Sequence, residues 1–383
     1  MKKTPLNSQQ LREVQRKLQN AGSLFTRPWS GTLGERPEPV GRFGERYFAM
    51  TEDVTGHLYT ADHSNKHVLL YGLLLVAAGV SLYFLAGSLA TIVVLFGDSR
   101  VLDALTSTIV LSANAAVLVG SVLIFTDLFL LLPSRRRGPL VACDDPVNRH
   151  VTVVLTAYND ELSIGESVRD FAAHPLVRRV IVVDNNSEDR TSEVAASAGA
   201  IVVVEKEPGY GKCVFRALTE GLAQTDTDLT LLCEGDMTFR AFDIDKFMSY
   251  IPHAEIVNGT RIVEQLRERD TQLTTFMYYG NFAVGKLLEA KYLGQGTFTD
   301  VGTTYKLCRN SALRRLLPVL DPRVNLEFNA HFLDTALKHR FSLVECPITF
   351  HKRWGVSKGG NVDNRKALGV GLQMIKGIVF SWN

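Results

Sequence analysis

The stretch Asp228-Leu-Thr-Leu-Leu-Cys-Glu-Gly-Asp-Met-Thr-Phe239 joins a short apolar run to two acidic residues. Residues 229–233 are apolar apart from one threonine, which is typical of a buried strand. Glu234 and Asp236 follow directly, separated by one glycine. In an open α/β sheet, the ligand site lies at the carboxyl ends of the strands. Two carboxylates there, without a nearby histidine, predict a site for Mg²⁺ or Mn²⁺ bridging to a phosphate, although an ordinary polar turn has the same composition.

Strand-like and helix-like patterns alternate from residue 151 onwards. Further β-rich runs occupy residues 151–156, 177–183 and 200–204, and helix-like segments occupy residues 163–173, a stretch ending near 197, and 208–221. Successive β-α-β-α units predict a parallel sheet with right-handed crossovers. The expected fold class is therefore α/β, with a mostly parallel, Rossmann-like sheet flanked by helices. The polar loops after the first, second and fourth strands should converge at one edge of this sheet.

Two long apolar runs precede the α/β pattern. Residues 68–97 and 104–126 contain no charged side chain. Each run is at least as long as the ~20 residues that a helix needs to cross a bilayer core, so we expect a transmembrane hairpin rather than two core helices. The connection at residues 97–107 has no basic excess, whereas Lys66 and the basic residues 135–137 flank the outer ends. By the positive-inside rule, both ends should face the cytoplasm.

These patterns divide the chain into four parts. They are a cytosolic N-terminal extension (1–66), the transmembrane hairpin (67–133), the α/β domain (134–359) and a C-terminal amphipathic helix (360–383). In the last part, one helical face carries Leu368, Leu372, Ile375 and Val379, and exposed positions carry Lys366 and Lys376. This pattern is typical of a helix at a membrane interface, although a core-packed helix has the same period.

Composition narrows the class of protein further. The chain has 383 residues, 46% of them hydrophobic, and a net charge of +2, which gives no argument for a nucleic-acid partner. Its five cysteines lack CxxC spacing, which favours reduced thiols in a cytosolic domain over disulfides or a zinc site. We expect an integral membrane protein with its α/β domain facing the cytoplasm. The membrane that we expect is a bacterial or archaeal plasma membrane.

Three further loops carry groups that suit a nucleotide. Gly209-Tyr-Gly-Lys212 opens a helix, so its backbone N–H groups and its lysine favour an anion such as diphosphate. Asp184 ends a strand and needs hydrogen-bond donors, which a nucleobase, a ribose or a helix N-cap at residues 186–188 would supply. Arg353-Trp-Gly-Val-Ser-Lys358 suits a phosphate clamp, although a solvated surface turn has the same composition.

Together these loops resemble the motifs of family 2 glycosyltransferases of the GT-A fold, particularly the branch similar to dolichyl-phosphate sugar synthases. The similarity covers roughly residues 151–358. The matching segments, in chain order, are Thr156-Ala-Tyr-Asn-Asp-Glu161, Val182-Val-Asp-Asn-Asn-Ser187, Gly211-Lys212, Glu234-Gly-Asp236, Asn258-Gly-Thr-Arg261, Thr299-Asp-Val-Gly-Thr-Thr-Tyr305 and Arg353-Trp-Gly-Val-Ser-Lys358.

The resemblance implies roles for individual residues. It implies that Asp184 holds the base of the nucleotide sugar. The residues that it implies are in contact with this nucleotide sugar are Thr156, Tyr158, Asn159, Glu161, Asp184, Asn186, Ser187, Gly211, Lys212, Gly235, Arg261 and Ser357. It implies that a divalent metal is held by Glu234, Asp236 and Thr238. It implies catalytic roles for Asp236, Asp300, Arg353 and Lys358, the last two by holding phosphates.

The chain departs from the family pattern at several positions. Asn185 replaces the usual second aspartate of its loop, and Cys213 replaces a glycine. Glu234 replaces the first aspartate of the metal motif, which keeps an oxygen ligand on a longer arm. His331 stands where relatives carry a carboxylate, so no role is assigned to it. The hairpin precedes the catalytic domain, whereas in the better-known members it follows.

The resulting hypothesis is an inverting glycosyltransferase that moves a sugar from a UDP- or GDP-linked donor to a membrane polyprenyl phosphate. A phosphate acceptor is already ionised at pH 7 and does not need a general base. Asp300 would orient the acceptor, act as a base or have a purely structural role. One alternative is transfer to a hydroxyl of a glycolipid or polysaccharide, and a second is a catalytically silent membrane scaffold. A homo-oligomer is left open.

Overall fold

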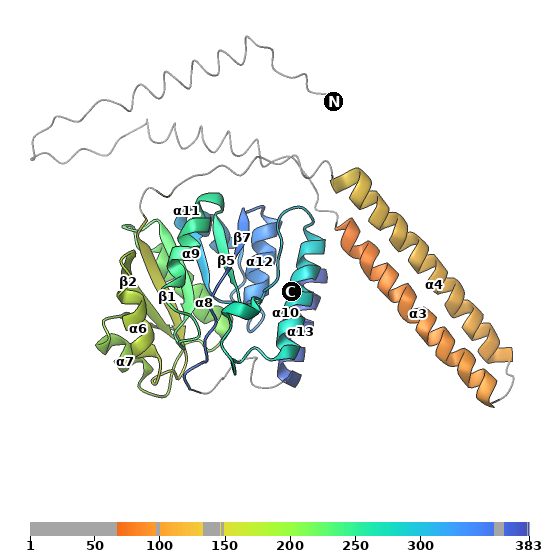
Figure 1. The fold of residues 1–383 in the computed structure, drawn as a ribbon, viewed down its shortest axis with the longest axis horizontal. Helices are drawn as coiled ribbons and strands as arrows, with labels where there is room; N and C mark the ends of the chain where they lie inside the picture. Colours follow the sequence, from red (N-terminus) through yellow and green to blue (C-terminus); the bar gives the residue numbers. More distant parts are fainter. Residues whose placement is uncertain are drawn as a thin grey trace, which may run out of the picture. The chain divides into compact units, whose positions relative to one another are not determined.

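The computed structural model describes residues 67–96, 100–132, 146, 149–355, 364–380 and 382. Predictions about residues 1–66, the basic residues 135–137, Ser357 and Lys358 lie outside the described residues. The chain forms a helical hairpin and a seven-stranded sheet with helices on both faces (Figure 1).

The hairpin consists of α3 (Val68–Phe96) and α4 (Arg100–Thr126), which is followed by a π-helical turn at Asp127–Leu131. Both helices are long and apolar enough to cross a membrane, and few of their side chains are buried, which distinguishes them from core helices. Helix α4 begins at Arg100, so the expectation that residues 97–107 form the connection was wrong beyond residue 99. Asp103 in the first turn of α4 interacts favourably with the helix dipole, which explains this early start.

Small residues bring the two helices of the hairpin close together. A Cβ atom on Gly72 would lie 2.9 Å from the carbonyl oxygen of Gly120, and one on Gly79 would lie 2.9 Å from that of Ala113. Such positions allow close backbone approach between apolar helices. Asp127 is buried and accepts a hydrogen bond of 2.6 Å from the backbone N–H of Leu69, so this carboxylate caps the start of α3.

The sheet confirms the predicted fold class. Its strands are β1 (Val151–Ala157), β2 (Val177–Asp184), β3 (Ile201–Val204), β4 (Leu229–Glu234), β5 (Ile256–Thr260), β6 (Lys306–Arg309) and β7 (Leu343–Pro347), in the order β3-β2-β1-β4-β6-β5-β7. Strand β6 is antiparallel to both of its neighbours, and every other pair is parallel. Every residue of β1 is buried, as expected for a central strand covered by helices on both faces.

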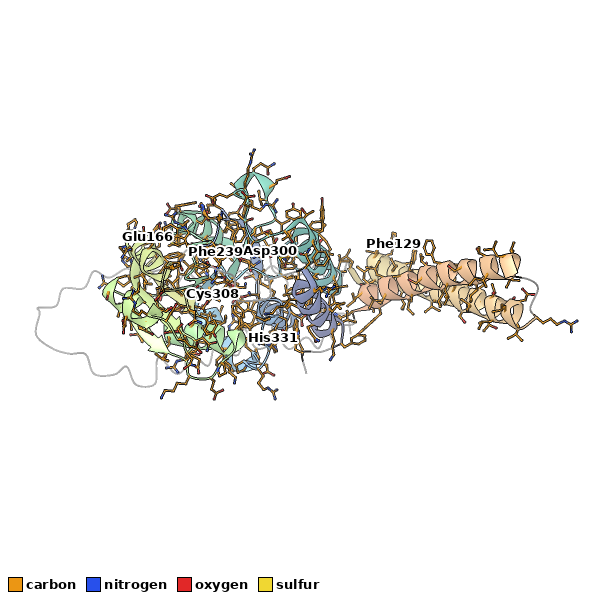
Figure 2. The ribbon with its side chains drawn as sticks, turned by 90° about the horizontal axis from the view of Figure 1, so that it is seen from below. Phe129, Glu166, Phe239, Asp300, Cys308 and His331 are labelled. Atoms are coloured by element: carbon orange, nitrogen blue, oxygen red, sulfur yellow. The ribbon has the colours of Figure 1, made fainter. Side chains whose placement is uncertain are left out.

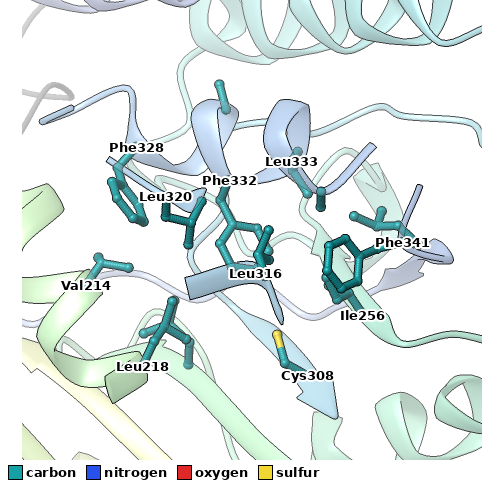
Figure 3. Close-up of a cluster of buried hydrophobic side chains, with 14 of the residues drawn as sticks. Val214, Leu218, Ile256, Cys308, Leu316, Leu320, Phe328, Phe332, Leu333 and Phe341 are labelled. Carbon is teal, nitrogen blue, oxygen red and sulfur yellow. The ribbon is translucent and has the colours of Figure 1, made fainter. Parts of the chain in front are cut away.

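Two hydrophobic clusters, one on each face of the sheet, anchor the helices. The helices of the domain are α6 (Ile164–Ala172), α7 (Thr191–Ser197), α8 (Tyr210–Leu222), α9 (Asp243–Tyr250), α10 (Thr275–Lys291), α11 (Asn310–Leu316), α12 (Phe328–Lys338) and α13 (Asn364–Val379), with 3₁₀ turns at Ile251–His253, Glu264–Leu266 and Leu317–Val319. Side chains of α8, α11 and α12 form one cluster with strands β5 and β6 (Figure 3). The other cluster is formed by α6, α7 and α9.

Helix α13 packs beside α10 and α12. Its inner side chains Met374, Ile378 and Val379 are buried, whereas Leu368 and Leu372 on the outer side are about half exposed. The helix therefore has a core-packed side and an exposed apolar side.

The end of the chain is fixed by a buried carboxylate. Asp334 of α12 accepts hydrogen bonds of 2.7 Å from Nζ of Lys291, at the end of α10, and from Nε1 of Trp382. Trp382 also lies against Gly377, where an added Cβ atom would come within 2.4 Å of the indole ring. These contacts join α10, α12 and the segment after α13.

His331 has a structural role in α12. Its Nε2 accepts a hydrogen bond of 2.9 Å from the backbone N–H of Asp321, and its ring packs against Phe328 and Trp382 (His331 is labelled in Figure 2). Burial lowers the pKa of His331 to about 4. A proton on Nε2 would remove the acceptor that Asp321 uses, so the folded state holds this ring neutral.

We expect the domain to lose stability as the pH falls from 6.5 towards 4. In this window the unfolded chain binds a proton on His331 that the folded chain excludes, so unfolding is favoured by about 3 kcal/mol at the lower end. His331→Gln keeps an oxygen that can accept from Asp321 but cannot titrate. Thermal unfolding at several pH values should show a smaller acid-induced drop in the midpoint for this variant, and an equal drop in both proteins would contradict the assignment.

Candidate active site

The loops that follow β1, β2 and β4 meet at one edge of the sheet, as expected for the ends of neighbouring parallel strands. In the register of these strands, Thr156 lies opposite Glu234, and Ala157 lies opposite Asp184. The backbone N–H of Gly235 donates to the carbonyl oxygen of Thr156 at 3.0 Å. An added Cβ on Gly235 would come within 2.4 Å of Ile164, so glycine lets the carboxylate loop pack closely there.

A cavity of about 760 Å³ opens at this edge. Its polar part is lined by residues that include Thr156, Tyr158, Asp160, Asn185, Asn186, Glu234, Asp236, Arg261, Gln272 and Arg353. Its apolar part is lined by α10 and α13, through residues that include Phe276, Met277, Val284, Leu372, Met374 and Ile375. One continuous cavity therefore joins charged groups to an apolar groove.

Asp236 is buried and bonded through both of its oxygens. Its Oδ1 accepts from the backbone N–H of Thr238 at 3.0 Å and from the Thr238 hydroxyl. Its Oδ2 lies 2.9 Å from a guanidinium nitrogen of Arg353, whose other terminal nitrogen lies 2.7 Å from Asp160. Burial and the neighbouring Glu234 raise the pKa of Asp236 to about 6, and Arg353 opposes this shift. Arg353 thus neutralises carboxylates from two loops.

The segment after β7 holds Arg353 in this position. The backbone N–H of His351 donates to the carbonyl oxygen of Thr238 at 2.9 Å, and that of Trp354 donates to the backbone carbonyl oxygen of Asp236 at 3.2 Å. The Nε of Arg353 is buried and has no hydrogen-bond partner among the described residues. Since a buried donor without a partner is costly, this nitrogen is suited to an anionic ligand.

Asp300 forms a buried ion pair with Arg261. Figure 2 labels Asp300, which is fully buried, and its two oxygens lie 2.7 and 2.8 Å from Nε and a terminal nitrogen of Arg261. Burial alone would raise the pKa of Asp300, but Arg261 and backbone donors hold it below its ordinary value. Arg261 lines the cavity. Asp300 therefore fixes the orientation of Arg261.

The carboxylates at the end of β4 fit a hard divalent cation. Glu234 and Asp236 supply oxygen donors that line the cavity. The described residues contain no group of three or more His, Cys, Asp or Glu side chains placed to hold a metal. A cation that binds through one or two carboxylates and completes its shell with substrate phosphates and water needs no larger group, which is the mode that Mg²⁺ favours.

Comparison with known proteins assigns the domain to a family. Residues 152–317 match the pattern of Glycosyl transferase family 2. This range runs from β1 to the turn after α11 and includes Asp184, Glu234, Asp236, Arg261 and Asp300. The chain carries a family 2 glycosyltransferase domain.

Relatives of this glycosyltransferase domain occur in bacteria and archaea. An uncharacterized glycosyltransferase of Mycobacterium tuberculosis is 39% identical over 112 residues, which is 29% of this chain and 48% of that protein. The chain thus spans about half the length of this mycobacterial relative. A dolichyl-phosphate hexose transferase of Haloferax volcanii is 27% identical over 209 residues, which is 54% of this chain and 86% of that protein.

Solved structures also match the domain. Glucosyl-3-phosphoglycerate synthase from Mycobacterium tuberculosis, in complex with Mn²⁺, UDP and glucosyl-3-phosphoglycerate, is 17% identical with a TM-score of 0.44. The match covers 60% of this chain and 79% of that one.

In the glycosyltransferase domain, hydrogen bonds join the loop after β1 to the loop after β2. They involve residues that were predicted to bind the nucleotide sugar. Asn159 donates its backbone N–H to Ser187 Oγ at 2.8 Å and accepts from the N–H of Glu188 at 2.7 Å. Glu161 accepts from the N–H of Arg190 at 3.2 Å. Of the predicted residues in these loops, the cavity lining includes Thr156, Tyr158 and Asn186, whereas Asn159, Glu161 and Ser187 support them.

Asp184 shapes its own loop. Its Oδ1 accepts from the backbone N–H of Ser187 at 3.0 Å and from the Ser187 hydroxyl, and its Oδ2 accepts from the hydroxyl of Ser192. Ser187 lies in the loop after β2, and Ser192 lies in the first turn of α7. The N-cap of α7 is Arg190, so the helix N-cap at residues 186–188 that the sequence left open does not form. A base contact by Asp184 stays a prediction.

Asn185 was noted in the sequence only as a departure, and it joins two loops of the site. Its Nδ2 donates to the carbonyl oxygens of Glu205 and Glu207, the latter at 2.8 Å, and its Oδ1 accepts from the N–H of Gly209 at 3.0 Å. An aspartate cannot donate to those carbonyls, so the amide is required by these contacts.

In the predicted phosphate loop, Gly211 and Lys212 make contacts within the protein. Gly211 is buried, and an added Cβ would lie 1.7 Å from the carbonyl oxygen of Val324. Nζ of Lys212 lies 2.7 Å from Glu207, and the half-exposed lysine is outside the described cavity lining. Diphosphate contacts by these two residues stay predictions.

Two further residues that the sequence did not single out line the cavity. Asp160 lies in a quoted motif but carried no predicted role, and it bonds Arg353 from a loop almost two hundred positions away. Gln272 lies between β5 and α10, and its Nε2 is buried without a hydrogen-bond partner among the described residues. A long irregular loop gives no periodic signal, so the sequence pattern could not identify Gln272.

Proposed function

We propose that the protein transfers a sugar from a nucleotide diphosphate sugar to a polyprenyl phosphate in a membrane, with inversion at the anomeric carbon. The observation that carries this proposal is the single cavity that joins the carboxylates and Arg353 to the apolar groove between α10 and α13. A nucleotide sugar suits the charged part, and an isoprenoid chain suits the groove, because apolar pockets bind apolar groups and a few polar groups fix orientation.

Three further observations support a lipid acceptor. Helix α10 exposes Phe276, Tyr279 and Phe282, and α13 exposes Leu368, Leu372 and Ile375, as expected for helices at a membrane surface. His67, just before the apolar helix α3, lies 3.0 Å from the carbonyl oxygen of Lys291 at the end of α10. The Haloferax relative is named a dolichyl-phosphate hexose transferase.

The chemistry follows from charge placement. Glu234 and Asp236 would hold Mg²⁺ or Mn²⁺, which stabilises the negative charge that develops on the leaving diphosphate. Arg261, oriented by Asp300, and Arg353, whose Nε has no partner among the described residues, bring positive charge to the same cavity. The acceptor phosphate is ionised near neutral pH and attacks without a general base. This agrees with an Asp300 that is buried in an ion pair.

The direct experiment uses the full-length protein in detergent with labelled UDP- or GDP-sugars, Mg²⁺ or Mn²⁺, and a short polyprenyl phosphate. We expect a labelled lipid that mild acid cleaves, because a glycosyl phosphodiester is acid-labile. Absence of product with every donor would contradict the enzymatic proposal and favour a silent scaffold. A lipid or polysaccharide product that survives mild acid would indicate a hydroxyl acceptor instead.

A bulky side chain placed in the apolar groove tests whether this groove binds the lipid acceptor. Gly280 of α10 lines the cavity, and an added Cβ there meets nothing within 4 Å, so Gly280→Phe should place a ring in the groove without disrupting the fold. We expect the KM for the lipid acceptor to rise about 10-fold, while nucleotide binding is unchanged. Gly369→Phe on α13 is the matched control, because Gly369 is also open but outside the described lining. Equal kinetics of the two variants would argue against this acceptor site.

A further inference from the structure

A cluster of hydroxyl and amide groups surrounds one oxygen of Glu234. The hydroxyl of Thr304 lies 2.6 Å from Glu234 Oε1, and the hydroxyl of Tyr210 lies 3.4 Å from the same oxygen and within hydrogen-bond distance of Thr304. Nδ2 of Asn329 lies 2.8 Å from the Tyr210 hydroxyl. Thr304 and Asn329 are almost completely buried. Tyr210 and Asn329 also line the cavity, so the cluster lies in the cavity wall beside Glu234.

Lys306 determines how Asn329 is oriented. Its Nζ lies 3.3 Å from Oδ1 of Asn329 and also donates to the carbonyl oxygen of Thr303. A carbonyl oxygen can only accept, so the NH₂ group of Asn329 faces Gly302 and the hydroxyls, and its side-chain oxygen faces Lys306. The same nitrogen lies 3.2 Å from the carbonyl oxygen of Gly302 and 3.2 Å from the hydroxyl oxygen of Thr304.

The hydrogen bonds of the cluster then run in one direction. The Asn329 amide donates to Tyr210, which leaves the Tyr210 hydroxyl to donate to Thr304. Thr304 in turn donates to Glu234 Oε1. Within the described part of the chain, the other oxygen of Glu234, Oε2, makes no hydrogen bond to protein, whereas both oxygens of Asp236 do.

We propose that Tyr210 and Thr304, oriented by Asn329, are positioning residues that hold Oε1 of Glu234, so that Glu234 ligates the divalent cation through Oε2 alone. This inference rests on the metal site of the proposed function but is independent of the acceptor. It also accounts for a glutamate at a position where relatives carry aspartate. The longer side chain reaches hydroxyls that an aspartate, shorter by one C–C bond of about 1.5 Å, would leave without their acceptor.

The test measures Mn²⁺ binding in the presence of UDP or GDP, by electron paramagnetic resonance of free Mn²⁺, without any lipid. Thr304→Val removes the donor to Glu234 and keeps the side-chain shape, so we expect the Kd for Mn²⁺ to rise about 10-fold, as is typical when a partner of a metal ligand is lost. Thr304→Ser keeps a hydroxyl and should restore binding. Thr335→Val, another buried threonine of the domain, should bind Mn²⁺ like the wild type.

A second measurement separates positioning from a general structural effect. If Thr304 acts through Glu234, Thr304→Val should have no further effect on the Kd in a Glu234→Ala background, because alanine has no oxygen for Thr304 to hold. An equal loss in both backgrounds would overturn the proposal, as would wild-type affinity in Thr304→Val and Tyr210→Phe. A wild-type protein that binds no Mn²⁺ with either nucleotide would overturn it as well. A protein that binds Mn²⁺ as expected but makes no lipid product would contradict only the proposed acceptor.

Discussion

Replacing Asp236 with asparagine should lower the rate of sugar transfer by about 10³-fold, the scale of losing one electrostatic contact to the developing charge. The carboxylate is buried just after β4, and it accepts hydrogen bonds from both Arg353 and Thr238. An asparagine keeps the shape and can still accept from Thr238. It removes the negative charge that a divalent cation requires, and it turns an NH₂ group towards the Arg353 guanidinium, which cannot accept a hydrogen bond.

The measurement is product formation at saturating donor and Mn²⁺, with thermal unfolding to confirm that the variant is folded. Asp245→Asn on α9 is the matched control, because its carboxylate is largely exposed and its close ionic partner is His174. We expect this control to retain wild-type activity. A folded Asp236→Asn protein with an undiminished rate would falsify the role of this carboxylate.

Replacing Gly211 with alanine should destabilise the glycosyltransferase domain by about 3 kcal/mol, at the upper end of ordinary overpacking. The added Cβ would lie 1.7 Å from the carbonyl oxygen of Val324, so the start of α8 and the segment before α12 would have to separate. Backbone atoms cannot move aside as a flexible side chain can. The sequence alone attributed Gly211 to phosphate binding, whereas its surroundings explain the glycine by packing.

This effect is measured as a fall in the midpoint of thermal unfolding in detergent. Gly369→Ala in α13 provides the control, because its Cβ would meet nothing within 4 Å. Alanine in the middle of a helix is favoured over glycine by up to about 1 kcal/mol, so this variant should unfold at the same or a slightly higher temperature. Indistinguishable midpoints of the two variants would contradict this prediction, because they would show that the backbone at Val324 moves away from the added Cβ at little cost in stability.

Much of the fold could be predicted because it depends on the pattern of hydrophobic residues within short segments of the sequence. The hydrophobic runs of β1, β2 and β4, and the helices between them, follow from periodicity over a few residues. Helix α4 started earlier than predicted, because Asp103 is favourable in a first turn although it interrupts the charge-free run. Strand β6 runs antiparallel to its neighbours, and a short run such as 306–309 contains no signal for direction.

The site was predictable only in part. Loops at the ends of parallel strands must converge, so the sequence brought Thr156, Tyr158, Asn186, Glu234 and Asp236 to one edge. It could not show which polar groups face the cavity and which bond to one another. Hydrogen bonding within and between loops engages Asn159 and Asp184, and these partners depend on side-chain distances of about 3 Å between separate segments.

By itself the sequence determined the α/β class, the apolar hairpin and the pair of carboxylates after β4, because each depends on neighbouring residues and on backbone geometry. Only the tertiary structure decided what each carboxylate does. It paired Asp300 with Arg261, placed Arg353 on Asp236 and enclosed one oxygen of Glu234 within a hydroxyl cluster. Charges and hydrogen bonds act over a few ångströms, and folding brings together groups that are far apart in the chain, such as Arg353 and Asp236.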